Sequence, residues 1–232
     1  MTTGEELSTF ITALNADAAI DPTLLDVLVD NGRTVIEEER PWVVLRKTDT
    51  SKTVTPANTW QTAIDLSTIT DFSRFYGEFP IRIFDGNNLI EYYRQVPFDR
   101  RLTMKDFGNT FVYDANAKML YLNGLVAFSG TLYIQYISTS TAIDLTSASA
   151  VWTAFPSRFL PILGYYAIQT FKGAIDYDSI NREMLPENAA AYTMLKNSMT
   201  AWDDSLQLSS IEGNDPTNLY GSPRPGSVNK YE

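Results

Sequence analysis

The chain has 232 residues, 44% of them hydrophobic, and a net charge of −10, so it can bury a substantial core. It contains no cysteine and no histidine, which excludes disulfides, thiol nucleophiles, thiolate zinc sites and Ser-His-Asp or Cys-His catalysis. The acidic balance also argues against a surface that holds nucleic-acid phosphates. Because cysteine and histidine are both missing, we also expect the protein to bind no cofactor.

Two helices are predicted within residues 1–40. Apolar residues at steps of three and four indicate an amphipathic helix over residues 5–14. Asp21 and Pro22 begin a second helix, as its N-cap and its first helical residue. The apolar face of that helix is expected to comprise Leu24, Leu25, Leu28, Val29 and Val35. Residues 37–39, three glutamates, are interpreted as a solvated run, with a contact to a basic partner as the alternative.

From residue 41 to about residue 136 the apolar residues follow a period of two, which is typical of strands. Strands are predicted at residues 42–45, 59–66 and 132–137. The clearest hairpin joins residues 81–84 to residues 89–93, because Asp85-Gly86 supplies the positive φ that a tight turn needs.

A second hairpin is predicted between residues 111–113 and residues 119–122, through the turn at residues 114–117. Several short strands separated by turn residues indicate a central antiparallel β sandwich or small barrel. Residues 138–151, rich in Ser, Thr and Ala, are expected to connect this part to the last helices.

The strongest periodicity lies in residues 155–209, which predict two helices around an acidic turn at residues 174–181. Pro161 fits the first turn of the first helix. Residues recurring at steps of three and four form the apolar face of the second helix: Tyr192, Leu195, Met199, Trp202 and Leu206. Lys196, Asn197, Asp203 and Asp204 lie on its other faces. Because neither helix can bury such a face alone, the two are expected to pack as a hairpin.

The chain is thus predicted to be α+β, with a helical bundle formed by its N- and C-terminal segments. The divisions are N-terminal helices at 1–40, a β-rich domain at 41–150, a helical hairpin at 151–210 that completes the bundle, and an extended arm at 211–232. Gly and Pro residues punctuate the last segment, which cannot form a core. It is interpreted either as a loose tail or as an arm that orders against a neighbouring subunit.

Three motifs in the C-terminal region resemble tailed-phage head-to-tail adaptor proteins, the connector or tail-tubular subunits. They are Phe-Pro-Ser-Arg-Phe-Leu-Pro at 155–161, Lys-Gly-Ala-Ile-Asp-Tyr-Asp at 172–178 and Asn-Arg-Glu-Met-Leu-Pro-Glu-Asn at 181–188, followed by Trp202. The resemblance covers about a quarter of the chain, and the order of helices, strands and helices is also similar.

The resemblance implies a non-enzymatic virion protein that forms a homo-oligomeric ring, a dodecamer, between the portal protein and a tail or nozzle protein. DNA would be only passing cargo, and no membrane is involved, since no run reaches a membrane span. The expected location is the virion neck, after assembly in the host cytoplasm. Contacts to the portal or a neighbouring subunit are expected at Leu219, Tyr220, Val228 and Tyr231. Tail-side contacts are expected at the β turns, through Asp85, Asn87, Asn88, Asp114 and Asn116.

Two other functions stay open. Carboxylate pairs, Asp176 with Asp178 or Asp203 with Asp204, could serve a hydrolase if they lined a cleft. A virion carbohydrate-binding module could use exposed tyrosines, although such residues more often form half-buried cross-strand pairs. The candidate tyrosines are Tyr92, Tyr93, Tyr113, Tyr121, Tyr133 and Tyr136.

Overall fold

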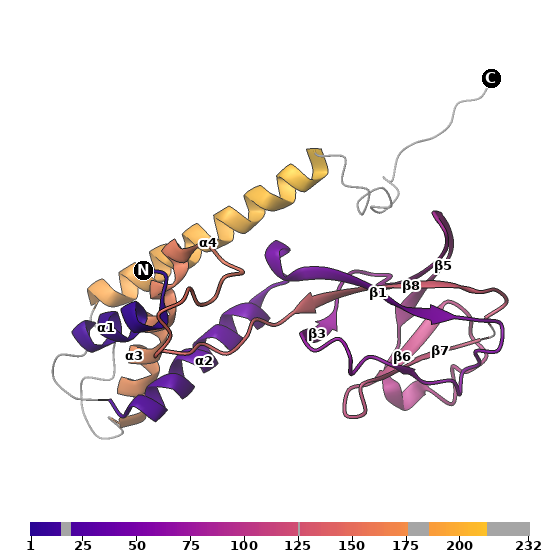
Figure 1. Cartoon of the computed structure of the whole chain (residues 1–232), viewed down its shortest axis with the longest axis horizontal. Coiled ribbons are helices and arrows are strands. Elements are labelled where there is room, and N and C mark those ends of the chain that lie inside the picture. The colour runs from indigo at the N-terminus through magenta and orange to yellow at the C-terminus, as the bar shows by residue number, and fades with distance from the viewer. Residues whose placement is uncertain (15–19, 125, 176–185, 213–232) are drawn as a thin grey trace.

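The computed structural model describes residues 1–14, 20–124, 126–175 and 186–212, and within them the protein is α+β. Helices gather at one end and the sheet forms the other (Figure 1). The helices are α1 (Gly4–Leu14), α2 (Pro22–Glu39), α3 (Pro161–Ile175) and α4 (Pro186–Glu212). The strands are β1 (Arg46–Val54), β2 (Ile64–Asp65), β3 (Phe72–Phe75), β4 (Ile81–Asp85), β5 (Asn88–Gln95), β6 (Thr110–Asp114), β7 (Met119–Leu122) and β8 (Gly130–Ser138).

The predicted start of α2 is confirmed. The carboxylate of Asp21 accepts hydrogen bonds from the backbone N–H groups of Thr23 (2.9 Å) and Leu24 (3.2 Å), and Pro22 occupies the first helical position. Gly32 lies within α2 and does not interrupt it. A Cβ at that position would lie 2.7 Å from Cδ1 of Tyr166, so the glycine allows α2 and α3 to approach closely.

Helix α3 contacts α1, α2 and α4, so segments from both ends of the chain share one core. Leu7 of α1, Leu28 of α2, Leu163 of α3 and Met199 of α4 are all buried in it. The segment after β8 also packs there, because Ile143 and Leu145 are buried in the same cluster.

The sheet is mixed and nearly closed, with a barrel-like curvature, in the strand order β1-β8-β4-β5-β6-β7-β2. Strand β8 is central: β1 pairs along one edge, while β4 and β3 share the other edge. The prediction of a purely antiparallel sheet is wrong at one place, because β5 and β6 pair in parallel at Arg94–Thr110 and Gln95–Phe111. The sequence pattern of each hairpin predicts its own two strands, but it does not predict how a strand of one hairpin pairs with a strand of the other.

Both predicted hairpins are confirmed. β4 and β5 pair antiparallel around Gly86, whose φ is +58°, and β6 and β7 pair antiparallel around the turn after Asp114. The sheet encloses a second core that includes Ile83, Phe111 and Leu132.

Two predicted strands are wrong. Residues Val43–Leu45 form a 3₁₀ turn rather than a strand, because the buried Trp42 donates its indole N–H to the carbonyl of Ile36 (2.7 Å) and bends the chain back onto α2. Residues 59–66 form a strand only at Ile64–Asp65, since the preceding segment folds as hydrogen-bonded turns, with Thr62 N–H donating to the carbonyl of Thr59 (2.8 Å).

Candidate functional site

Helix α2 carries an exposed apolar face that includes Leu24 and Val35, two residues predicted to lie in the core. Leu24, Val27, Asn31 and Val35 recur at steps of three and four, so they share one face. Leu24 is 42% exposed, Val27 51% and Val35 46%. The buried face instead includes Leu25, Leu28, Val29 and Ile36. The prediction for Leu24 and Val35 is therefore wrong, because the helix has apolar residues on two faces and only one of them meets α3.

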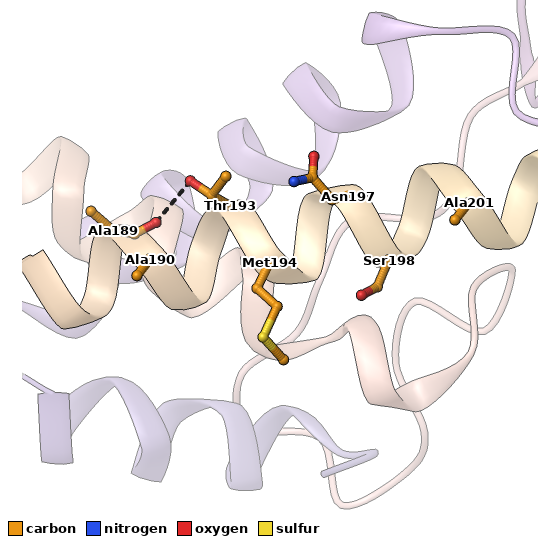
Figure 2. A pocket seen from close by; sticks show the side chains of 7 residues that line it. All are labelled: Ala189, Ala190, Thr193, Met194, Asn197, Ser198 and Ala201. Carbon is orange, nitrogen blue, oxygen red and sulfur yellow. Dashed lines mark hydrogen bonds between the residues drawn. The ribbon is translucent and has the colours of Figure 1, made fainter.

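Helix α4 also has an exposed face, which is uncharged and carries shorter side chains than the exposed face of α2. It is an open, nearly flat surface, and every residue that forms it comes from this helix. Figure 2 shows Met194 and Ser198 projecting from one side of the helix and Thr193 and Asn197 from the other. The residues that form this surface are Ala189, Ala190, Thr193, Met194, Asn197, Ser198 and Ala201. Apart from Met194, which is 69% exposed, their side chains are short, so they leave space for the side chains of another helix.

The opposite face of α4 is the one that the sequence predicted to be apolar. Met199 is fully buried, and Tyr192, Leu195 and Trp202 pack against the helical core. The two faces of α4 and α2 described above are turned away from that core. In Figure 1, α4 runs along one edge of the helical part and α2 along the other.

The prediction that Asp203 lies outside the buried face of α4 is wrong. Its side chain is fully buried, accepts a hydrogen bond from the backbone N–H of Val43 (2.6 Å) and forms an ion pair with Arg40 (3.0 Å). Arg40 also reaches the exposed Asp204 (2.7 Å). Through Arg40, the carboxylates of Asp203 and Asp204 thus connect α4 to the end of α2.

Glu37 is a buried carboxylate with three hydrogen-bond donors. It is 4% exposed, and its carboxylate accepts from Arg33 Nη1 (3.0 Å), the Ser140 N–H (3.1 Å) and Trp152 Nε1 (2.8 Å). The prediction of a solvated glutamate run is wrong here, because Ser140 and Trp152, two of the three donors, come from the segment after β8, more than a hundred residues away. The side-chain hydrogen bond from Arg33 also lowers the pKa of Asp30 below its ordinary value. The hydrogen bonds of Glu37 with Ser140 and Trp152 thus connect α2 to the segment after β8.

The predicted tail-side residues occupy two separate turns. Asp85, Asn87 and Asn88 lie in the exposed turn at the start of β5. Asp114 is half-buried and accepts from the N–H groups of Asn116 (3.0 Å) and Ala117 (3.1 Å), which closes the next turn. Because β6 pairs in parallel with the last residues of β5, this turn lies beyond the far end of β5. The structure therefore does not bring the two turns together.

The tyrosines proposed as a sugar platform mostly serve packing. Tyr93 is 1% exposed, and Tyr136 donates to Asp71 (3.0 Å) and stacks on Phe72. Tyr113 also packs against Phe72. Tyr121, Tyr133 and Tyr92 pack against Arg101, Phe84 and Phe79, respectively, and among the six only Tyr92 is largely exposed. One exposed tyrosine makes no platform for a sugar ring.

Several predicted residues fall outside the described ranges: Asp176, Asp178, Leu219, Tyr220, Val228 and Tyr231. Among the residues that the structure describes, acidic side chains nowhere gather in groups of three that could hold a metal ion. In the same part of the chain, the search for a helix long and apolar enough to cross a membrane found none. Comparison with models of protein families and with curated proteins found no match to this sequence.

Proposed function

We propose that this chain is a structural, non-enzymatic subunit of a tailed-phage head-to-tail adaptor, which forms a ring between the portal and the tail. The resemblance of residues 155–202 suggests this function. The observation that carries it is a pair of exposed helix faces that are turned away from the protein's own core: an apolar face on α2, which ends at the exposed Glu38, and an uncharged face of mostly short side chains on α4. Exposed contiguous apolar surface on a folded chain marks a site of association.

The two faces are suited to each other in a head-to-tail contact. The α2 face presents the bulky side chains of Leu24, Val27 and Val35, and the α4 face is an open surface of mostly short side chains. Packing the ridge of one helix into the groove of another is the ordinary mode of helix association. A contact between two different faces joins each subunit to the next, and such a contact closes into a ring when its rotation allows.

In this proposal, the helices of both termini form a bundle that packs beside its neighbours in a dodecameric ring. The β-rich part faces the tail or nozzle protein, and residues 211–232 reach the portal or a neighbouring subunit. The net charge of −10 suits a channel wall that repels DNA and lets it pass as cargo. The assembled ring would lie in the virion neck, after formation in the host cytoplasm.

Native mass spectrometry tests the self-association. We expect the wild-type chain to form oligomers, and we expect the double substitution Val27→Glu with Val35→Glu to leave folded monomers, because it buries two carboxylates in the contact. The matched control is Leu102→Glu with Phe107→Glu, which changes two exposed apolar residues of the β-rich part. Oligomers that persist in the α2 variant, or that are lost equally in the control, would contradict the assignment of this face.

The role of the arm is tested separately. Deleting residues 213–232 should leave a folded protein that no longer binds the portal. If the truncated protein still binds the portal as the full chain does, the proposed role of the arm in portal binding is wrong.

A further inference from the structure

The connection between β5 and β6 is the most apolar exposed segment of the described β-rich part. Phe98 is 44% exposed, Leu102 69% and Phe107 59%, although all three lie within one short stretch of chain. Three large apolar side chains this exposed within residues 98–107 contrast with the single, scattered ones that are normal on a protein surface, which makes this segment a candidate binding surface. We call Phe98, Leu102 and Phe107, with Arg94, Arg100 and Lys105, the connection patch.

The backbone beneath the connection patch is held in place by hydrogen bonds. Arg101 N–H donates to the carbonyl of Phe98 (3.0 Å), and Phe107 N–H donates to the carbonyl of Met104 (3.0 Å). Gly124, in the segment after β7, donates its N–H to the carbonyl of Lys105 (2.8 Å). The turns are thus preformed, which reduces the entropy that a partner must overcome on binding.

The patch is locally basic in an acidic protein. Residues 94–107 contain four basic and two acidic side chains, a net charge of +2, whereas the whole chain carries −10. Most basic residues of the helical end are neutralised, as Arg33 and Arg40 are by buried carboxylates. By contrast, within the described ranges Arg94, Arg100 and Lys105 make no ion pair.

A hollow of about 480 Å³ adjoins the patch and is lined by residues that include Trp60, Lys105 and Asp106. The Lys105 ammonium lies 5.6 Å from the centre of the Trp60 ring, and the Arg101 guanidinium lies 5.7 Å from it. Arg101 also stacks on Tyr121 at 3.6 Å, and its buried Nε has no hydrogen-bond partner. The hollow therefore combines an aromatic surface with the cation of Lys105 and the carboxylate of Asp106, and the Arg101 guanidinium lies close by. Such a hollow suits an apolar or aromatic side chain, with a carboxylate of the same partner held by Lys105.

We infer that the connection patch binds an acidic segment of another protein, in which aromatic or aliphatic residues alternate with Asp or Glu. The apolar residues of the segment would cover Leu102 and Phe107 and enter the hollow beside Trp60. Its carboxylates would pair with Arg100 and Lys105. This inference goes beyond the ring proposed above, because the patch uses no residue of the α2 or α4 face.

A protein segment fits this patch better than a nucleic acid does. Nucleic-acid surfaces gather many cations that neutralise successive phosphates, whereas here Asp99 and Asp106 lie among the basic residues. Exposed Phe and Leu side chains gain most from burial against apolar groups, and Phe and Arg are enriched in protein interfaces.

The probe is a display library of random 12-residue peptides, selected on the immobilised full chain. We expect the selected peptides to be enriched in Asp and Glu together with Phe, Trp, Tyr or Leu. Their binding should weaken at least about tenfold in Leu102→Ser with Phe107→Ser, and in Arg100→Glu with Lys105→Glu, and it should also weaken as salt rises from about 0.05 M to about 0.5 M.

The control is Val27→Ser with Val35→Ser, which removes two exposed apolar side chains from α2 and should leave peptide binding unchanged. Because this control alters the proposed ring contact, it separates failure of the patch from failure of self-association. The inference is overturned if selection yields no peptides, if it yields basic or uncharged ones, or if the patch variants bind them as the wild type does. Tighter binding of a thymidine oligonucleotide than of the selected peptides would also overturn it.

Discussion

Replacing Glu37 by alanine should destabilise the protein far more than the same change at Glu39, two residues further along α2. Glu37 is 4% exposed and accepts hydrogen bonds from Arg33, Ser140 and Trp152. Glu39 makes one ion pair, with Lys196 at 2.8 Å, and the two side chains of that pair are 41% and 39% exposed.

The magnitude follows from the groups that lose their acceptor. Without the Glu37 carboxylate, the indole N–H of Trp152 and the backbone N–H of Ser140 lose their acceptor, and each such donor costs about 1–3 kcal/mol when it is buried. The buried Arg33 retains Asp30 but loses its second carboxylate partner. We therefore expect a loss of about 3–5 kcal/mol in the free energy of unfolding for Glu37→Ala. For Glu39→Ala we expect at most about 1 kcal/mol, because solvent screens the pair.

Thermal and urea unfolding, followed by circular dichroism, measure both changes. A chain of this length loses roughly 2–4 °C in Tm per kcal/mol, so Glu37→Ala should melt about 6–20 °C below the wild type. Glu37→Gln keeps a side-chain oxygen for Trp152 and should fall between the two alanine variants. Equal effects of Glu37→Ala and Glu39→Ala would refute the reasoning that the buried carboxylate joins α2 to the loop after β8.

Three further predictions concern stability. Gly32→Ala should lower the free energy of unfolding, measured in urea, by about 1–2 kcal/mol, because the new Cβ would lie 2.7 Å from the Tyr166 ring and this clash outweighs the higher helix propensity of alanine. A gain in stability would contradict the close α2–α3 contact. Asp21→Ala should cost about 1 kcal/mol by the same assay, since it removes the N-cap of α2, and Asp21→Asn should restore most of the loss. The pKa of Asp30 is lowered by its hydrogen bond with Arg33, and that of Asp71 is lowered by bonds from Lys47 and Tyr136 that outweigh burial. The stabilisation that these two carboxylates give to the folded protein is therefore present above their unfolded pKa of about 3.9, and it is lost as the pH falls through their lower pKa values in the folded state. Tm should thus drop below pH about 4, and an unchanged Tm at pH 3 would contradict this prediction.

Features that depend on neighbouring residues in the sequence were predictable. The N-cap at Asp21 and the turn at Gly86 were predicted correctly, because a cap or a tight turn is set by a few adjacent residues. The strand β1 was missed, since its sequence, Arg-Lys-Thr-Asp-Thr-Ser-Lys-Thr-Val, is polar and carries no apolar alternation. Its pairing with β8 holds it in the sheet.

Features that depend on distant segments were not predictable. Glu37 and Asp203 are buried because Trp152 and Val43, far away in the chain, supply donors for their carboxylates. The parallel pairing of β5 with β6 was also missed, since periodicity indicates a strand but not its neighbour or direction.

The candidate interaction surfaces were missed for a related reason. Helical periodicity identifies apolar faces, but it does not tell which of two such faces on α2 meets α3. Periodicity therefore assigns Leu24 and Val35 to the core, and it gives no indication that they share an exposed face with Val27. A signal was nevertheless present, because α2 has more apolar residues than one stripe can hold. Likewise Phe98, Leu102 and Phe107 lie in a stretch without strand periodicity, where apolar residues have no core role to explain them.

The most direct test of self-association through two different faces is a mixing experiment followed by native mass spectrometry. One variant carries Val27→Glu and Val35→Glu on α2, and the other carries Met194→Glu and Ala201→Glu on α4. Each variant alone should stay monomeric, and an equal mixture should give a dimer containing one copy of each, because one intact α2 face can still meet one intact α4 face. If either variant alone assembles as the wild type does, or if the mixture gives only monomers while the wild type forms oligomers, the α2–α4 contact is wrong. If the wild type is itself monomeric at all concentrations, the ring is contradicted.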